Sequence, residues 1–375
     1  MGDTGIDYVT RSWPVVEGCN RVSPGCDNCW AESLIGTRLK HLPLYDGLTA
    51  GGRWTGVVRT VPSRVLEPLT WHTPEIVFVA PRGDLFHPAV PADFLARVFA
   101  VMAMSPRQTF LLLTKRPARA RKVLSSDQFW WEVGEHGLGI AVARTRGQHR
   151  ASGPMQLTAN STPGGPWECV HPLGNVWVGV SIEDQDHARR ADELRRVPAA
   201  HRWVSAEPLL GPVDLSPWLA EECGECQGSG DFVDGPTCHV CLGAGRRDGI
   251  DWVVAGGETG RGARPMHPDW VRSLRDQCEE AAVPFMFKQW GSWGSRDDCP
   301  AVAATGVWLY PDGSRTTGAL SSPALARQVG EPAAMFPMPK KLSGRRIDGT
   351  VHTVMPFARL VGDRLEPTTQ PVAAP

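Results

Sequence analysis

Apolar residues gather in seven short runs along the chain, and polar residues follow each run. The runs are rich in β-branched and aromatic residues, and they are continuous where a half-exposed strand would alternate, which is typical of strands buried on both faces of a sheet. They cover residues 13–16, 76–80, 109–113, 176–180, 202–205, 251–255 and 284–287. We therefore expect seven strands in one buried sheet.

Helical periodicity fills several of the intervals between these runs. Segments 91–104, 186–196 and 267–282 carry apolar residues at helical spacing. Strands that alternate with helices favour parallel βαβ units. The pattern predicts an α/β fold, a partial or complete (β/α) TIM-like barrel, with an open doubly wound sheet as the alternative.

Two stretches interrupt the alternation. Residues from about 133 to 174 are rich in Gly, Pro, Ser and Thr, which predicts a surface insertion, and residues 219–249 hold four cysteines between two strands. The expected organisation is a first barrel part at 10–218, an inserted zinc module at 219–249, a last barrel part at 250–293 and a loop-rich C-terminal extension at 294–375.

Composition narrows the setting of the protein. The formal net charge is −1, so no global charge indicates a nucleic-acid or membrane partner, although net charge does not reveal local patches. No apolar stretch approaches the length of a membrane span, and no signal-peptide pattern opens the chain. We expect a cytoplasmic protein with no membrane partner, and its 10 cysteines then indicate metal binding or catalysis before disulfides.

Three of the cysteines, Cys19, Cys26 and Cys29, form the pattern C-x6-C-x2-C after the first run. The turn at Pro24-Gly25 favours the return of Cys19 to the other two. Three thiolates hold an iron–sulfur cluster and leave one iron open for a substrate, whereas four close the site. Zinc with a histidine as fourth ligand is the alternative. Since the nearest histidine is His41, twelve residues after Cys29, and the loop follows a predicted strand, we predict an iron–sulfur cluster.

A second group has the pattern C-x2-C-x11-C-x2-C, with glycines after each pair, at Cys223, Cys226, Cys238 and Cys241. Two such pairs supply four thiolates in a tetrahedral array, which predicts structural zinc. The group resembles the zinc modules of J-domain chaperones, and a second iron–sulfur cluster is the rival interpretation. Four protein ligands leave no open position, so this site is expected to stabilise the fold or dock a partner.

Polar side chains recur where the predicted strands end. The carboxyl ends of barrel strands meet at one face, where active sites form. These ends carry Cys19, Asp84, Lys115, Glu183, Glu207, Glu258, Lys288 and Gln289. We predict catalytic roles for Glu183, Glu207, Lys115 and Lys288. The alternative for each glutamate is a structural ion pair with Lys115, Arg116 or Lys288.

Longer motifs support a resemblance to a known family. They are Gly18-Cys19, the segments 23–32, 84–87, 113–117, 176–183, 205–212, 256–260 and 287–291, and parts of 340–349. In these motifs the chain is similar to a family of phage and mobile-element proteins of unknown function, often called the three-Cys-motif family. That family resembles radical S-adenosylmethionine (SAM) enzymes. The resemblance covers most of residues 10–357 apart from the two insertions.

The resemblance implies a partial TIM-like barrel with a 4Fe–4S cluster, in which SAM binds the open iron and reductive cleavage releases a 5′-deoxyadenosyl radical. Gly256, Gly257 and Glu258 resemble the element that holds the SAM amino group in radical SAM enzymes. That element normally follows the second strand, whereas here it follows the sixth, and Asp84 after the second strand is the alternative. The first cysteine spacing is six where radical SAM enzymes most often have three, and Asn28 stands where they have an aromatic residue.

Two functions follow from these observations. The leading hypothesis is a radical SAM-like 4Fe–4S enzyme that modifies or repairs a base in DNA or RNA. The alternative is a non-enzymatic phage protein that binds nucleic acid or a companion protein through zinc sites. The four-cysteine group, Lys115-Arg116 and Arg345-Arg346 motivate this alternative.

Overall fold

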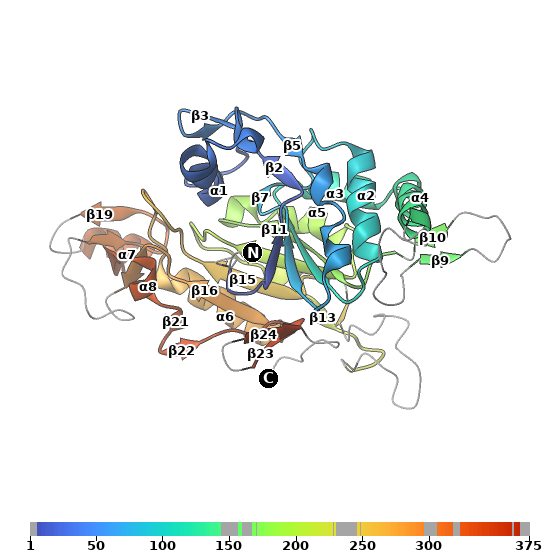
Figure 1. The fold of residues 1–375 in the computed structure, drawn as a ribbon. Coiled ribbons are helices and arrows are strands. Elements are labelled where there is room, and N and C mark those ends of the chain that lie inside the picture. The colour runs from blue at the N-terminus through green and yellow to red at the C-terminus, as the bar shows by residue number, and fades with distance from the viewer. Residues whose placement is uncertain are drawn as a thin grey trace.

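The computed structural model describes residues 6–143, 157–159, 167–169, 171–227, 229, 246–247, 249–295, 306–317, 323–361 and 364–367. Its centre is a 7-stranded parallel sheet (Figure 1). In spatial order the strands are β1 (Arg11–Trp13), β6 (Ile76–Val79), β8 (Thr109–Thr114), β11 (Val176–Ser181), β12 (His201–Ala206), β15 (Trp252–Gly256) and β16 (Phe285–Gln289). All seven predicted runs therefore contribute a strand.

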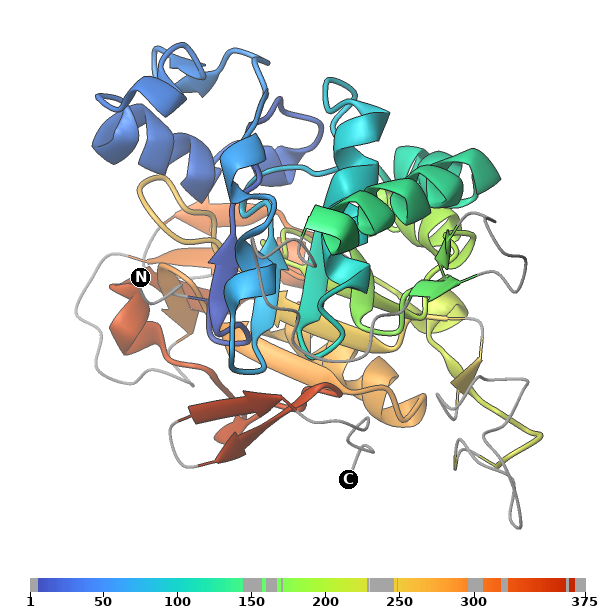
Figure 2. The ribbon, with the colours of Figure 1, turned by 45° about the vertical axis from the view of Figure 1, so that its right-hand side comes forward.

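The spatial order of these strands is also their order along the chain. A doubly wound sheet reverses direction at a switch point, and this sheet does not. It curls into a half-barrel instead, as Figure 2 shows from a second side. The expected partial (β/α) barrel is confirmed at this level.

Helices cover the outer face of the half-barrel. They are α2 (Ala92–Ala103), α3 (Pro117–Leu124), α4 (Asp127–Ala143), α5 (Arg190–Arg195) and α6 (Pro268–Glu280). α2, α5 and α6 lie where the sequence predicts helices, although α5 is shorter because the 3₁₀ turn η7 (Gln185–His187) precedes it.

The predicted surface insertion begins later than about residue 133, because α4 continues to Ala143. Phe129, Trp130 and Val133 of this helix are buried against the core. The glycines of α4, two of which are buried, disguised the helical pattern in the sequence. Beyond α4, the short strands β9 (Leu157–Ala159) and β10 (Trp167–Cys169) pair antiparallel.

The two faces of the sheet have different cores, since successive side chains of a strand point to opposite sides. The outer face packs on the helices in the main hydrophobic cluster. The inner face carries Trp177, Trp203 and Trp252, which the terminal segments cover with Tyr8 and Phe357. The interior of the half-barrel is therefore packed with side chains, as in TIM barrels.

The first predicted strand is divided, which corrects the expected start of the cysteine loop. β1 ends at Trp13, and Pro14, which lacks an N–H, separates it from β2 (Val16–Gly18). β2 joins a separate 3-stranded sheet with β5 (Arg59–Thr60) and β7 (Arg82–Gly83). Gly18 pairs with Gly83 in parallel register, so the chain delivers Cys19 and Asp84 next to each other.

A small lobe lies over the ends of the sheet strands (Figure 1). It is built from η1 (Pro24–Cys26), α1 (Trp30–Leu34), the π-helical η2 (Ile35–Leu39), η3 (Pro43–Tyr45), β3 (Thr49–Ala50) and β4 (Arg53–Trp54). Ile35, Tyr45 and Leu48 form its own small core. The turns η4 (Pro62–Arg64) and η5 (Glu67–Thr70) lead from the lobe to β6.

The C-terminal part contains more regular structure than the loop-rich extension that the sequence suggested. A 4-stranded sheet has the order β17 (Trp293–Ser295), β20 (Ala333–Pro337), β18 (Val307–Leu309) and β19 (Arg315–Thr317). It is accompanied by α7 (Pro323–Val329), α8 (Lys340–Ser343) and the hairpins β21–β22 (Arg346–Ile347, Thr350–Val351) and β23–β24 (Ala358–Val361, Arg364–Pro367). The strands of the 4-stranded sheet are only three to five residues long, too short for a clear periodic pattern.

No helix within the described ranges is long and apolar enough to span a bilayer.

Gly179 in β11 makes room for the central tryptophan of the interior. A Cβ atom added at Gly179 would lie 2.4 Å from the Trp203 ring, whose Nε1 donates to the Leu112 carbonyl at 3.1 Å. We predict that Gly179→Ala lowers the free energy of unfolding by about 1–3 kcal/mol, because the ring must shift. Urea denaturation measures this change.

Gly139 in α4 is the matched control, since a Cβ there meets no atom within 4 Å. Gly139→Ala should leave stability unchanged or raise it by up to about 1 kcal/mol, the helix preference of alanine. Equal destabilisation by both substitutions would contradict the role assigned to Gly179.

Candidate functional site

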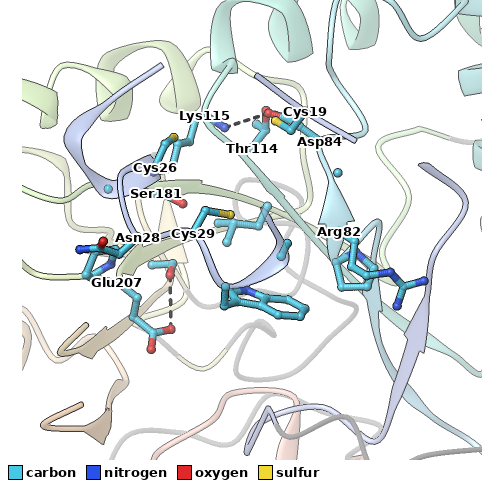
Figure 3. Close-up of a pocket in the computed structure, with 18 of the residues that line it drawn as sticks. Cys19, Cys26, Asn28, Cys29, Arg82, Asp84, Thr114, Lys115, Ser181 and Glu207 are labelled. Carbon is cyan, nitrogen blue, oxygen red and sulfur yellow. Dashed lines mark hydrogen bonds between the residues drawn. The ribbon is translucent and has the colours of Figure 1, made fainter. Parts of the chain in front are cut away.

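A cavity of about 260 Å³ lies at the carboxyl ends of the sheet strands, beneath the loop that carries the first three cysteines (Figure 3). Most of the predicted site residues line it, namely Cys19, Cys26, Cys29, Asp84, Lys115, Glu207, Gly257, Glu258 and Lys288. Glu183 and Gly256 do not line the cavity themselves, but each contacts a residue that does: Glu183 contacts Lys115, and Gly256 contacts Glu207. The half-barrel thus gathers residues that are far apart in the sequence.

The three cysteines are held by a short, well-defined loop. Cys26 ends the 3₁₀ turn η1, and Cys29 is the N-cap residue of α1. All three thiols are free and partly exposed. A Cβ at Gly25 would lie 2.5 Å from the Glu183 carboxylate, so only glycine lets the loop approach the end of β11 so closely.

The three thiols differ in their electrostatic surroundings. Burial and the neighbouring Asp84 carboxylate raise the pKa of Cys19 to about 11. Burial also raises the pKa of Cys29. Burial acts in the same direction on Cys26, but the positive charge of Lys115 and hydrogen bonds with the backbone outweigh it, so the pKa of Cys26 is lowered. Of the three thiols, Cys26, which is next to Lys115, therefore loses its proton most readily.

Glu183 fixes one side of the cysteine loop. Its carboxylate is fully buried, pairs with Lys115 and accepts hydrogen bonds from Ser23 Oγ at 2.8 Å and Arg190 Nη1 at 2.8 Å. Burial acts to raise the pKa of Glu183, and these two cations outweigh it, so the pKa is lowered. The predicted alternative of an ion pair with Lys115 is what the structure shows.

Glu258 fixes the other side of the same loop. Its Oε2 accepts from Asn28 Nδ2 at 2.9 Å and from the backbone N–H of Arg264 at 2.8 Å, and its Oε1 accepts from Arg264 Nη2 at 2.5 Å. Arg264 Nη2 also donates to the Pro24 carbonyl at 2.9 Å, and Asn28 donates to the Gly262 carbonyl. The loop after β15 therefore clamps the cysteine loop immediately before Cys29.

Asp84 is equally engaged. It accepts hydrogen bonds from Thr114 Oγ1 at 2.8 Å, the backbone N–H of Phe86 at 2.9 Å and Arg116 Nη1 at 2.6 Å. The same Arg116 nitrogen lies 3.8 Å from Cys19 Sγ, and its partner Nη2 donates to Asn20 Oδ1 at 2.6 Å. Arg116 thus connects the carboxylate after β6 with the first cysteine.

Glu207 and Lys288 form a further pair, with 3.1 Å between Lys288 Nζ and Glu207 Oε1. The Tyr8 hydroxyl donates to Glu207 Oε2 at 3.5 Å, and Lys288 Nζ lies 5.4 Å from the centre of the Tyr8 ring. Burial and the charge of Glu207 raise the pKa of Tyr8 well above its usual value, so its hydroxyl stays protonated at neutral pH. These three side chains form the part of the cavity that we call the floor.

The structure gives a steric reason for each of the two glycines that were predicted to contact SAM. A Cβ at Gly256 would lie 2.8 Å from Glu207 Oε1, so this glycine lets Glu207 reach across β15 toward Lys288. A Cβ at Gly257 would lie 2.0 Å from the Trp290 carbonyl oxygen. A contact of these residues with SAM remains a prediction.

Among the site residues that the sequence did not single out as functional are Tyr8, Asn28 and Arg264. Tyr8 precedes β1 and so escapes a search at the carboxyl ends of strands. Asn28 and Arg264 act through Glu258, and the Asn28–Glu258 contact joins residues 230 positions apart. For Asn28, its position between Cys26 and Cys29 was the one sequence feature that could have indicated a role in the site.

The second cysteine group is described in part. Cys223 and Cys226 are buried, whereas Cys238 and Cys241 lie outside the described residues. β13 (Glu221–Glu222) pairs antiparallel with β14 (Arg246–Arg247), which brings the two ends of the segment together. Within the described ranges, no three His, Cys, Asp or Glu side chains are gathered as ligands of a single metal ion. The zinc module therefore remains a prediction.

We predict that Arg264→Ala frees the cysteine loop, because it removes two charge-assisted hydrogen bonds to Glu258 and the bond to the Pro24 carbonyl. Such bonds contribute about 1.5–3 kcal/mol each, so amide hydrogen exchange in residues 24–29 should accelerate at least about tenfold. Arg261→Ala, at an exposed position of the same loop, is the control. Unchanged exchange in both variants would refute the clamp.

Comparison with known proteins places this architecture in a family. No curated protein and no solved structure matches the chain. The family model described as "Protein of unknown function (DUF5131)" matches residues 3–356, nearly the whole chain and every element of the cavity. The protein therefore belongs to this family of unknown function.

Proposed function

We propose that the protein is an iron–sulfur enzyme of the radical SAM type, with Cys19, Cys26 and Cys29 as the protein ligands of a 4Fe–4S cluster. One observation carries the proposal: three free thiols border a single cavity at the carboxyl ends of a parallel half-barrel. No fourth cysteine among the described residues lines that cavity. The donor set matches a cluster with one open iron.

The placement of the three thiols around one cavity supports this proposal. Each iron of a cubane cluster takes its own thiolate, so the three sulfurs must surround a space, and they need not converge on a point as ligands of one ion do. In Figure 3 the three cysteines border the same space from two segments of the loop. All three cysteines are partly exposed and line the cavity, which supports access of a metal from that side.

The cations of the site fit the charge that such a cluster brings. Lys115 lies next to Cys26, and Arg116 lies next to Cys19. Both are already paired with carboxylates, so they are held in place before any anion binds. A positive charge close to a thiolate stabilises it strongly where water is partly excluded.

When bound, a cluster with SAM on its open iron supplies a 5′-deoxyadenosyl radical that abstracts hydrogen from a substrate. The residues of this chain have supporting roles. Glu183 and Glu258 hold the cysteine loop, and Lys115 and Arg116 balance the charge of the thiolates. The floor, with Glu207 and Lys288, faces the remaining part of the cavity. The proposed substrate is a base of DNA or RNA.

We predict that anaerobic reconstitution yields a brown protein with equal amounts of iron and sulfide, which forms 5′-deoxyadenosine from SAM after reduction. Cys19→Ser, Cys26→Ser and Cys29→Ser should each lose most of the iron and all of this product, because each removes one of three ligands. Cys278→Ala, at a buried position in α6 outside the cavity, should keep both. Zinc in place of iron in the wild-type protein would overturn the proposal.

The second cysteine group supports a separate proposal of structural zinc. The buried thiols of Cys223 and Cys226, next to the β13–β14 pair, would supply half of a four-thiolate site. We predict about one zinc per chain by elemental analysis, lost in Cys223→Ser but retained in Cys26→Ser. Zinc loss in Cys26→Ser alone would contradict this assignment.

A further inference from the structure

A cluster of positive charge lies in the C-terminal part of the chain. Residues 332–347 contain no Asp or Glu, in a chain whose formal net charge is −1, and four exposed cations, which are Lys340, Lys341, Arg345 and Arg346. Among the described residues only Arg345 has an acidic partner, Asp7, at 4.0 Å. An exposed pair this long contributes little, so most of the charge remains available. We call residues 340–346 the basic segment.

Hydrogen bonds fix the basic segment to the loops that border the cavity. Ser343 Oγ donates to the Gly291 carbonyl at 2.8 Å. The next residue along that loop, Ser292, donates its backbone N–H at 2.8 Å to the carbonyl of Glu258, which lines the cavity. The basic segment is therefore attached at the carboxyl ends of β15 and β16, on the side of the sheet where the cavity opens.

An open depression of about 470 Å³ has the cavity at one end and the basic segment at the other. Gly260 in its lining directly follows Thr259, which lines the cavity. Pro339, also in its lining, directly precedes Lys340 of the basic segment. Trp293 adds an aromatic ring to this lining. An extended ligand with one group in the cavity reaches the cations by crossing this depression.

An exposed aromatic ring borders the cavity. Trp30 lines the cavity, yet it exposes 50% of its surface. Its backbone is held in the first position of α1, directly after Cys29. An aromatic side chain that is fixed and half exposed at a concave site offers a face on which a flat ring can stack. Proteins that bind single-stranded nucleic acid stack bases on such rings.

Together these features favour a polyanion that carries separate flat rings. Regularly spaced phosphates complement cations that no carboxylate neutralises. The cavity of about 260 Å³ admits a base only after the base has left a stacked duplex. A duplex would reach the basic segment with its phosphates but would leave Trp30 and the cavity unused. A single strand uses all of these groups at once.

We propose that the basic segment binds the phosphates of a nucleic-acid single strand, which crosses the depression and places one base in the cavity beside Trp30. The inference names the form in which the substrate of the proposed enzyme is bound, and in that respect it rests on the proposed function. Phosphate binding by the basic segment requires no cluster, so the full-length protein can be tested with and without iron.

Fluorescence anisotropy with labelled oligonucleotides of one sequence tests the proposal. Single-stranded DNA and single-stranded RNA are separate probes, and the tighter of the two identifies the polymer. That strand should bind at least about tenfold more tightly than the duplex, because only a single strand offers bases for stacking.

Replacement of both lysines, Lys340→Gln with Lys341→Gln, should weaken strand binding about tenfold at low salt. It should also reduce the dependence of log affinity on log salt by about 1.4, since each phosphate contact to a single strand contributes about 0.7. The control is Arg195→Gln with Arg196→Gln, two exposed neighbours at the end of α5. This control removes the same charge from the outer face and should change neither quantity.

Trp30→Ala should weaken strand binding about tenfold and leave the salt dependence unchanged, because stacking involves no phosphate. Trp30→Phe retains a ring and should recover most of the affinity. Trp131 on α4 exposes 49% of its surface, so Trp131→Ala is the matched control and should have no effect. Circular dichroism and iron content of each variant establish that it is folded and what it holds.

Equal binding of the duplex and the single strand would overturn the proposal. Equal effects of the lysine and arginine replacements, or of the two tryptophan replacements, would do the same. Lysine-dependent sedimentation with phosphatidylserine vesicles, without strand binding, would assign the basic segment to a membrane surface instead. Lysine-dependent strand binding by a protein that takes up no iron would support this inference while overturning the proposed enzyme. A protein that cleaves SAM but binds no strand would have the reverse meaning.

Discussion

Two buried carboxylates, Glu183 and Glu258, hold the cysteine loop above the half-barrel, and the geometry of the site depends on them. A buried carboxylate is costly unless it is paired and hydrogen-bonded. Glu183 is satisfied by Lys115, Arg190 and Ser23, and Glu258 by Arg264 and Asn28. Because Ser23 and Asn28 belong to the cysteine loop, pairing these charges also positions Cys26 and Cys29. Breaking one of these contacts would leave a buried charge unpaired. Because that is costly, the cysteine loop is held firmly in this position.

The cavity is thus divided into two parts with different chemistry. Sulfur and cations border it on the side of the loop, where Cys19 meets Arg116 and Cys26 meets Lys115. Tyr8, Glu207 and Lys288 border it at the floor. In the proposed enzyme the first part holds the radical source, and the second holds the base from which hydrogen is taken. The packed tryptophans beneath prevent a substrate from passing further into the half-barrel.

The sequence was sufficient to predict the sheet, because its apolar runs are continuous and each ends in polar residues. It predicted catalytic roles for Glu183, Glu207, Lys115 and Lys288 and named ion pairs among such residues as the alternative. The structure shows two such pairs, Glu183 with Lys115 and Glu207 with Lys288, which is possible because strand ends meet at one face. The sequence pattern missed the division of the first strand, because Pro14 lacks an N–H and interrupts the strand. It also missed the extent of α4, because the glycines of this helix disguise its periodic pattern. The Asn28–Glu258 contact and the position of Tyr8 depend on tertiary packing between distant segments, and one sequence carries no signal for such contacts.

The most direct test of the central claim is electron paramagnetic resonance of the reduced, reconstituted protein with and without SAM. A cluster held by Cys19, Cys26 and Cys29 has one iron without a protein ligand, so SAM should bind to it and change the spectrum. The account predicts a cluster signal that SAM shifts in the wild-type protein and that is absent in Cys26→Ser. A cluster signal that SAM leaves unchanged, or a protein that takes up zinc and no iron at these cysteines, would contradict it.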